Sequence, residues 1–185
     1  MKESEAVLMD NVDIEKKALK TLKEACDTGK EVVDIIKVAK SLGFIVGNAE
    51  LSDDEDGFII VNEQENEILG QQTSRLIGIN SNQSIEWKRF IIAHELGHYI
   101  LHYDEKADRG MFAHRDHKKG KDEKENEADF FAANLLMPRD RFIACYNSLN
   151  NSCISLDEKV LLMANRFVVT DNMARRRFKE LNLNE

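Results

Sequence analysis

His94-Glu95-Leu96-Gly97-His98 is the most informative segment of this sequence, and it lies inside the apolar run from Phe90 to Leu101. In a helix, side chains four residues apart share one face, so the imidazoles of His94 and His98 can bind one ion. Glu95 is then close enough to take a proton from a water molecule at that ion. The spacing therefore predicts a metal site with two histidine ligands and a glutamate base.

The residues around the motif predict a long, buried helix. Ser84 is a suitable N-cap, and no proline interrupts the chain from Trp87 to His102, where apolar residues lie on nearly every face. Histidines and a glutamate inside such a helix need partners, because an unpaired buried charge is costly. A metal ion would satisfy them, and a chance match with separately hydrogen-bonded core histidines is the alternative. Gly97 indicates that another backbone approaches closely.

A catalytic zinc takes three protein ligands and leaves a fourth position for water. One known pattern places the third ligand ten residues after the first histidine, following a glycine that breaks the helix. Asp104 and Leu101 occupy those two positions here, so the chain lacks the glycine that this pattern requires.

A better source of the third ligand is the segment Glu125-Asn126-Glu127-Ala128-Asp129, which opens an apolar helix that Pro138 ends. Glu125 and Asp129 share a face, so one can bind the metal while the other accepts an imidazole N–H. Glu127 points about 200° away from Glu125 around the helix. We therefore assign Glu125 as the ligand and Asp129 as the acceptor. A solvated first turn, favoured by the helix dipole, is the alternative and suits Glu127 better than Asp129.

Several segments of the chain resemble the ImmA/IrrE family of metallopeptidases. The two most specific are Trp87-Lys88-Arg89-Phe90-Ile91-Ile92-Ala93-His94-Glu95-Leu96-Gly97-His98 and Glu125-Asn126-Glu127-Ala128-Asp129-Phe130-Phe131-Ala132-Ala133-Asn134-Leu135-Leu136-Met137-Pro138. Asp56-Gly57-Phe58-Ile59 and Ile77-Gly78-Ile79-Asn80 resemble the short strands before that family's active helix. The resemblance covers residues 14–183, which is nearly the whole chain.

The resemblance implies a zincin-like α+β fold, in which a small, mainly antiparallel sheet packs on an active-site helix pair. It implies that His94, His98 and Glu125 bind Zn²⁺ and that Glu95 is the catalytic base. It also implies a site-specific endopeptidase that cleaves a helix-turn-helix transcriptional repressor and so relieves repression of a mobile element or a stress response. Mn²⁺ is the less favoured ion, since imidazole and carboxylate ligands are not exclusive to zinc.

A zinc-binding regulatory module, which binds a repressor or DNA without proteolysis, is the alternative function. Such a module would be expected to lose the base, whereas Glu95 is present. The presence of the base favours the enzyme.

Composition limits the class of protein. The 185 residues suffice for one domain with a small appendage, and 42% of them are hydrophobic, enough for a sizeable core. No apolar run reaches the roughly 20 residues of a membrane-spanning helix, and the start, Met-Lys-Glu-Ser-Glu, lacks a signal-peptide pattern. We therefore expect a cytoplasmic protein without a membrane partner.

A net charge of −8 disfavours nucleic acid as the main ligand. Three scattered cysteines, Cys26, Cys145 and Cys153, predict reduced thiols.

We expect three parts along the chain. They are an N-terminal tail that can be disordered (residues 1–13), a metallopeptidase domain (14–149) and a helical, helix-turn-helix-like appendage (150–185). Apolar stripes predict two helices, and alternating segments predict short strands at residues 44–51, 58–61, near 68–69 and 75–80.

Residues 103–122, between the two metal-bearing helices, predict a charged loop that borders the cleft. We expect His114 and His117 within it to be solvated or to contact a ligand residue, and not to be ligands themselves. Contact of one of them with the substrate is the alternative. Peptide hydrolysis also needs a hydrogen-bond donor for the developing oxyanion. The candidates are Tyr103, Tyr146, His114 and Arg115.

The C-terminal segment predicts two helices, at residues 156–167 and 170–181, in an arrangement that resembles a helix-turn-helix. Arg175-Arg176-Arg177 could contact phosphates, yet nearby acidic residues nearly cancel their charge. Protein docking or completion of the core is therefore favoured over direct DNA binding.

Overall fold

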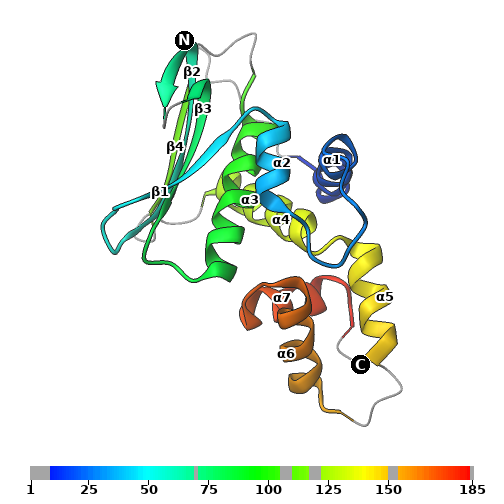
Figure 1. The fold of residues 1–185 in the computed structure, drawn as a ribbon. Coiled ribbons are helices and arrows are strands. Elements are labelled where there is room, and N and C mark those ends of the chain that lie inside the picture. Colours follow the sequence, from blue (N-terminus) through cyan, green and yellow to red (C-terminus); the bar gives the residue numbers. More distant parts are fainter. Residues whose placement is uncertain (1–8, 69–70, 105–109, 117–121, 150–153, 184–185) are drawn as a thin grey trace.

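The computed structural model describes residues 9–68, 71–104, 110–116, 122–149 and 154–183, and in it a sheet lies against a group of helices (Figure 1). The strands are β1 (Ile45–Ala49), β2 (Glu55–Ile68), β3 (Gln71–Asn80) and β4 (Met111–Asp116). The helices are α1 (Asn11–Glu24), α2 (Ile35–Ser41), α3 (Ile85–His102), α4 (Glu123–Leu136), α5 (Arg139–Leu149), α6 (Leu156–Phe167) and α7 (Asp171–Glu180).

The sheet has the strand order β1-β3-β2-β4, with β1 parallel to β3 and the other two pairs antiparallel. The predicted small, mainly antiparallel sheet is therefore confirmed. Ile59, Val61, Ile77 and Ile79 are buried at alternate positions of the two central strands, as expected for a sheet with one face in the core. Gly57 lets α3 approach this sheet, because a Cβ there would lie 2.6 Å from Ile91 Cγ2.

Two predictions about the sheet were wrong. The strand predicted at residues 58–61 extends over all of β2, and β4 lies within the segment predicted to be a loop. Neither segment shows its structure locally, since residues 62–67 are polar and β4 is a short, mixed sequence. Pairing with β2, about 50 residues away along the chain, makes β4 a strand, and such long-range pairing overrides local propensity.

Helix α3 forms as the sequence predicted. Ser84 is its N-cap, with the side-chain oxygen accepting the Trp87 backbone N–H at 3.2 Å, and every residue from Phe90 to His98 is buried. A Cβ at Gly97 would lie 3.1 Å from the Cα and the carbonyl oxygen of Ala128. The expected close backbone approach is therefore the crossing of α3 and α4, which fixes the distance between the two site-bearing helices.

The N-terminal helix begins inside the segment predicted to be a tail. Asp10 is the N-cap of α1, so residues 11–13 are helical, and residues 1–8 lie outside the described part of the chain. Ile14, Ala18 and Leu22 are buried on one side of α1, which packs against α4.

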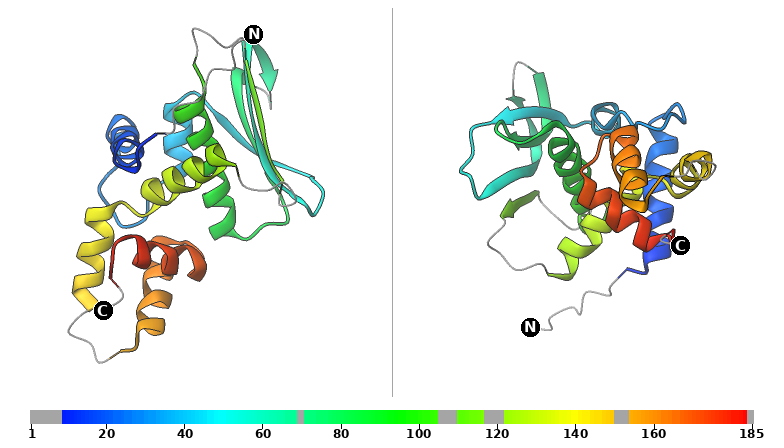
Figure 2. Two further views of the ribbon diagram at one scale, coloured as in Figure 1. Left: turned by 180° about the vertical axis from the view of Figure 1, so that it is seen from behind. Right: turned by 90° about the horizontal axis from the view of Figure 1, so that it is seen from below.

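The two C-terminal helices begin and end close to the predicted residues (Figure 2). A capping box formed by Ser155 and Glu158 starts α6, and Thr170 caps α7. Between them Val168 adopts a left-handed conformation, with a φ of 53°, which turns the chain sharply.

A buried arginine ties α7 to the end of α4. Arg177 is 1% exposed, and its guanidinium donates to Asn134 Oδ1 at 2.8 Å, to the Met137 carbonyl at 3.1 Å and to Glu180 Oε2 at 3.2 Å. Burial lowers the pKa of Arg177, and the Glu180 carboxylate opposes that shift. The other two arginines of the run also bind acids of this protein, Arg175 to Asp157 at 2.7 Å and Arg176 to Glu180 at 3.0 Å.

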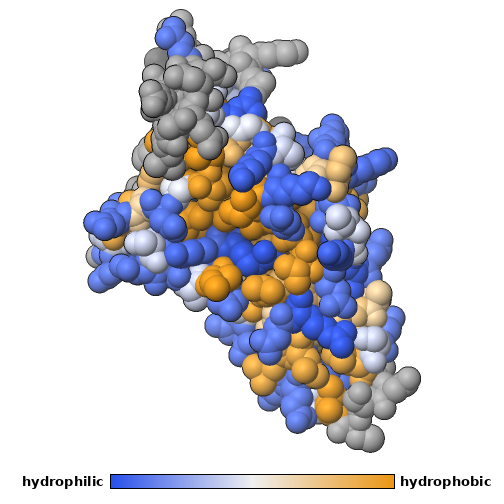
Figure 3. Space-filling model, viewed as in Figure 1, coloured by the Kyte–Doolittle hydropathy of each residue, from blue (hydrophilic) through white to orange (hydrophobic). Residues whose placement is uncertain are grey.

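Polar and charged residues cover most of the face in Figure 3, and apolar residues gather near its centre. Within the described ranges, no helix is long and apolar enough to cross a membrane. Cys26 and Cys145 are free thiols, and Cys153 falls outside the described residues.

Candidate metal centre

Helices α3 and α4 bring three predicted ligands together. His94 Nε2 and His98 Nε2 are 3.0 Å apart. The Glu125 carboxylate approaches both, with Oε2 3.3 Å from His94 Nε2 and Oε1 3.1 Å from His98 Nε2. Among the described residues, these three form the group of histidine, cysteine and acidic side chains that could hold a metal ion.

The other nitrogen of His94 faces the predicted acceptor. His94 Nδ1 lies 3.0 Å from Asp129 Oδ1, and both side chains are buried, at 0% and 2% exposed. A carboxylate can only accept, so the proton of this hydrogen bond stands on Nδ1. The Nε2 atom of a neutral His94 therefore carries a lone pair that points toward His98 and Glu125.

A second row of hydrogen-bonded side chains, which the sequence did not predict, orients His98. His98 Nδ1 lies 3.1 Å from His102 Nδ1, and His102 Nε2 lies 2.9 Å from Glu127 Oε2. The other oxygen of Glu127 accepts the Met9 backbone N–H at 2.6 Å. Since Glu127 accepts from His102 Nε2, a neutral His102 must accept from His98 Nδ1, which leaves His98 Nε2 with a lone pair.

Three electron-pair donors thus face one another, namely the Nε2 atoms of His94 and His98 and the carboxylate of Glu125. Such an arrangement is repulsive unless a cation or a shared proton lies between the donors. Zinc bonds of about 2.0–2.2 Å in a tetrahedron place ligand atoms about 3.3–3.5 Å apart, close to the 3.0–3.3 Å found here. The close approach of the His94 and His98 rings also holds the pKa of Glu125 far below its usual range, so this carboxylate is ionised. The residues fit a divalent metal ion.

Glu95 lies on α3 directly after His94, and its side chain is fully buried. The structure thus leaves Glu95 next to a candidate ligand along the chain, where the sequence predicts the general base.

Two of the residues that support the site were missed or misjudged. A solvated position was the alternative that the sequence offered for Glu127, but its side chain is 12% exposed and binds His102. Burial lowers the pKa of His102, and the hydrogen bond with Glu127 partly offsets this shift. His102 could have been found from its spacing, because it extends the row of His94 and His98 by four further residues.

The remaining candidates have other positions. Asp104 is exposed and outside the metal-binding group. Tyr103 stacks on Tyr99 at 5.5 Å, and Tyr146 packs edge-on against Phe178 of α7 at 5.5 Å. His114 and Arg115 belong to β4, and their side chains, like the whole of His117, lie outside the described structure.

Comparison with known proteins gives one family. The model of the IrrE N-terminal-like domain, Peptidase_M78, matches residues 52–179, more than two thirds of the chain. The match includes α3 and α4 in full. A search of the curated proteins found no match.

Proposed function

Because the chain belongs to the Peptidase_M78 family of IrrE N-terminal-like domains, we propose that it is a zinc-dependent, site-specific endopeptidase. The family and the α+β architecture make it a zincin-like, metallopeptidase-type protein. We propose, beyond this family assignment, that the ion is zinc, that a peptide bond is hydrolysed and that the substrate is a protein.

The observation that carries this proposal is the convergence of His94, His98 and Glu125, with lone pairs facing one another. The Nδ1 atom of each imidazole makes a hydrogen bond, that of His94 with Asp129 and that of His98 with His102. Hydrogen bonds of this kind fix the tautomer and the orientation of metal-binding histidines. Two imidazoles and a carboxylate with ligand atoms within 4.8 Å of one another are a donor set that suits a divalent metal ion.

When bound, Zn²⁺ lowers the pKa of a water ligand to about 7 and polarises a carbonyl group. The residues of this chain would do the remaining work. Glu95 would accept the proton of the attacking water and deliver it to the leaving amine. Its burial on α3 keeps bulk water from competing for that proton.

We further propose that the substrate is a helix-turn-helix transcriptional repressor in the cytoplasm, cut at a limited site so that repression of a mobile element or a stress response is relieved. The family resemblance supports this choice of substrate. Direct DNA binding by the C-terminal helices is disfavoured, because Arg175, Arg176 and Arg177 all bind acceptors within the protein. Phosphate contacts would require breaking those pairs.

The test is co-expression of candidate helix-turn-helix repressors with the wild-type protein and with the Glu95→Gln variant, followed by mass spectrometry. The wild type should yield two fragments with one defined cut, and Glu95→Gln should yield none while retaining one zinc per chain. His94→Ala should lose both zinc and cleavage.

Equal cleavage by wild type and Glu95→Gln, free of contaminating protease, would show that the base is wrongly assigned. Tight repressor binding without any fragment would instead establish the non-proteolytic zinc module. Equal activity with Mn²⁺ alone would overturn the choice of zinc.

A further inference from the structure

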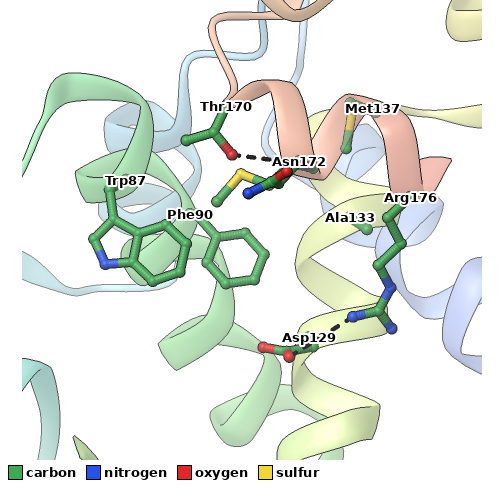
Figure 4. A pocket seen from close by; sticks show the side chains of 9 residues that line it. Trp87, Phe90, Asp129, Ala133, Met137, Thr170, Asn172 and Arg176 are labelled. Atoms are coloured by element: carbon green, nitrogen blue, oxygen red, sulfur yellow. Dashed lines mark hydrogen bonds and ion pairs between the residues drawn. The ribbon is translucent and has the colours of Figure 1, made fainter. Parts of the chain in front are cut away.

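A cavity of about 420 Å³ lies between α3, α4 and α7, beside the metal centre (Figure 4). Its walls are mainly apolar, and the residues that matter for the argument are Trp87, Phe90, Ala133, Met137 and Met173. The volume falls in the range of roughly 300–1,000 Å³ that is typical of ligand pockets. Helix α7, which the sequence assigns to a C-terminal appendage, supplies one wall.

The cavity continues the row of side chains that forms the metal centre. On α4, Glu125, Asp129 and Ala133 follow at steps of four residues, so neighbouring members of this row share a face, and Met137 follows at the C-cap. The same holds on α3, where Phe90 precedes His94 by one turn and its ring lies 6.1 Å from the imidazole. The cavity and the metal centre therefore lie next to each other along the two helices.

The distance between them suits a single polypeptide substrate. Phe90 is about 6 Å along α3 from His94, and Ala133 is about 12 Å along α4 from Glu125, at 1.5 Å per residue. An extended chain covers about 3.3 Å per residue. A peptide at the metal centre thus reaches the cavity within about two to four residues of the reacting bond.

Asp129 is the wall that the two sites share. Its Oδ1 accepts from His94 Nδ1 at 3.0 Å, and its Oδ2 lies 3.9 Å from Arg176 Nη1 (Figure 4). One carboxylate oxygen of Asp129 therefore accepts a hydrogen bond from an imidazole, and the other lies near a guanidinium. Thr170, Asn172 and Arg176 line the cavity on the side of α7, and the apolar walls are formed by Trp87, Phe90, Ala133, Met137 and Met173.

Those walls are suited to a large apolar side chain. Trp87 and Phe90 stack at 5.3 Å with an interplanar angle of 22° and present a flat aromatic surface. The thioethers of Met137 and Met173 are flexible and polarisable, so they adapt to aromatic and aliphatic shapes.

We propose that this cavity is a specificity pocket that binds one large apolar side chain of the polypeptide substrate, two to four residues from the bond that is cut. The proposal rests on the proposed peptidase function for its biological meaning. Binding in the pocket can be measured without cleavage, so the two proposals can fail separately.

The first experiment follows the pocket directly by ¹³C-methyl NMR of the methionines, using full-length Glu95→Gln protein so that peptide is not consumed. The probes are a blocked pentapeptide, Ac-Ala-Ala-Phe-Ala-Ala-NH₂, and its all-alanine counterpart. The Phe peptide should shift the Met137 and Met173 methyl signals saturably, with at least tenfold weaker binding of the alanine peptide. Met163, fully buried in α6, is the internal control. Trp87, the single tryptophan of the chain, should report the same binding curve by fluorescence.

Filling the pocket should abolish this binding. Ala133→Leu places three carbons into the cavity, whereas Ala144→Leu makes the same change at an exposed position of α5. We expect Ala133→Leu to remove the methyl shifts and to lower kcat/KM for the cleaved repressor about 10–100-fold, with zinc content unchanged. Ala144→Leu should match the parent in all three measurements. Met173→Ala, which widens the pocket from α7, tests the same site should Ala133→Leu lower the melting temperature.

Equal shifts with the Phe and alanine peptides, or identical behaviour of Ala133→Leu and Ala144→Leu, would overturn the specificity pocket even if the repressor is cut. Absence of cleavage together with selective, blockable Phe binding would overturn the peptidase function and leave an apolar peptide pocket. Toluene binding as tightly as the Phe peptide would make the cavity a small-molecule site, contrary to the proposal.

Discussion

Helix α4 carries two buried polar clusters, one near each end, and they differ in how donors and acceptors are matched. At the N-terminal end, Glu125 meets the lone-pair nitrogens of His94 and His98. At the C-terminal end, Asn134 and the Met137 carbonyl meet the guanidinium of Arg177, where donors face acceptors. The first cluster consists of metal-binding side chains, whereas the second contains a cationic side chain of the protein itself.

This difference distinguishes a binding site from a cluster that only stabilises the fold. We call the second cluster, formed by Arg177, Asn134 and the Met137 carbonyl, the structural lock. A buried polar cluster that satisfies itself stabilises one arrangement of helices. A cluster of acceptors alone costs free energy until a cation arrives, and a fold retains it because binding recovers that cost. The same helix therefore holds a metal centre and, about three turns further on, the anchor of α7.

The largest effect is expected for Glu125→Ala, which tests whether the cluster at the N-terminal end of α4 binds a metal ion. The variant removes one of the three proposed ligands. We expect near-zero zinc by elemental analysis after gel filtration. Zinc at 100 times its Kd should stabilise the wild type by about 2.7 kcal/mol, and the variant should show no such rise in Tm. Glu123→Ala, in the exposed first turn of the same helix, should behave as wild type. Retained zinc in Glu125→Ala would assign the third ligand elsewhere.

The second prediction concerns the lock. Arg177→Met removes the buried charge and leaves Asn134 and the Met137 carbonyl without their donor. Breaking a buried charged pair typically costs about 3–5 kcal/mol, so urea unfolding should show a loss of this size. Zinc stoichiometry at low temperature should stay at one per chain. Arg175→Met, whose guanidinium pairs on the surface, should cost at most about 1 kcal/mol. Equal losses in both variants would mean that Arg177 is no lock.

The third prediction concerns the two carboxylates that orient the imidazoles through hydrogen bonds. Asp129→Asn and Glu127→Gln each weaken a hydrogen bond that orients a ligand histidine. Loss of such partners typically lowers metal affinity 10–100-fold, which competition with a chromophoric chelator would measure. We expect similar losses in the two variants. An unchanged affinity in Glu127→Gln would show that His102 does not orient His98.

The smallest effect is expected at Arg176, whose guanidinium lies 3.9 Å from Asp129 and whose side chain is 51% exposed. Solvent screens such a pair, so Arg176→Ala should change the free energy of unfolding by less than about 1 kcal/mol. Denaturant melts beside those of Arg177→Met would measure the contrast between adjacent arginines. A loss as large as that of Arg177→Met would place both arginines in the lock.

Much of the metal centre could be predicted from local sequence. The four-residue spacing of His94 and His98, and that of Glu125 and Asp129, fixes which side chains share a helix face whatever the rest of the fold does. The apolar surroundings of α3 likewise predicted its burial, because no polar stripe remains to face solvent. The structure brings these side chains together, and their catalytic and ligand roles remain our proposal.

Contacts between distant segments could not be predicted in this way. Strand β4 exists because β2 offers it an edge, and Glu127 is held in the interior because His102 lies opposite it. Both outcomes depend on how two elements approach each other, which no local pattern encodes.

By itself, the sequence determined the helices, their buried faces and the order of donor side chains along each face, since these follow from periods of 3.6 residues. Only the tertiary structure decided how the faces meet. The contact of Gly97 with Ala128 sets the crossing of α3 and α4, and this crossing places Glu125 on the two imidazoles. The docking of α7 through Arg177 then closes one wall of the apolar pocket. These distances arise from packing between segments remote in the chain, where shape and hydrogen-bond partners select one arrangement.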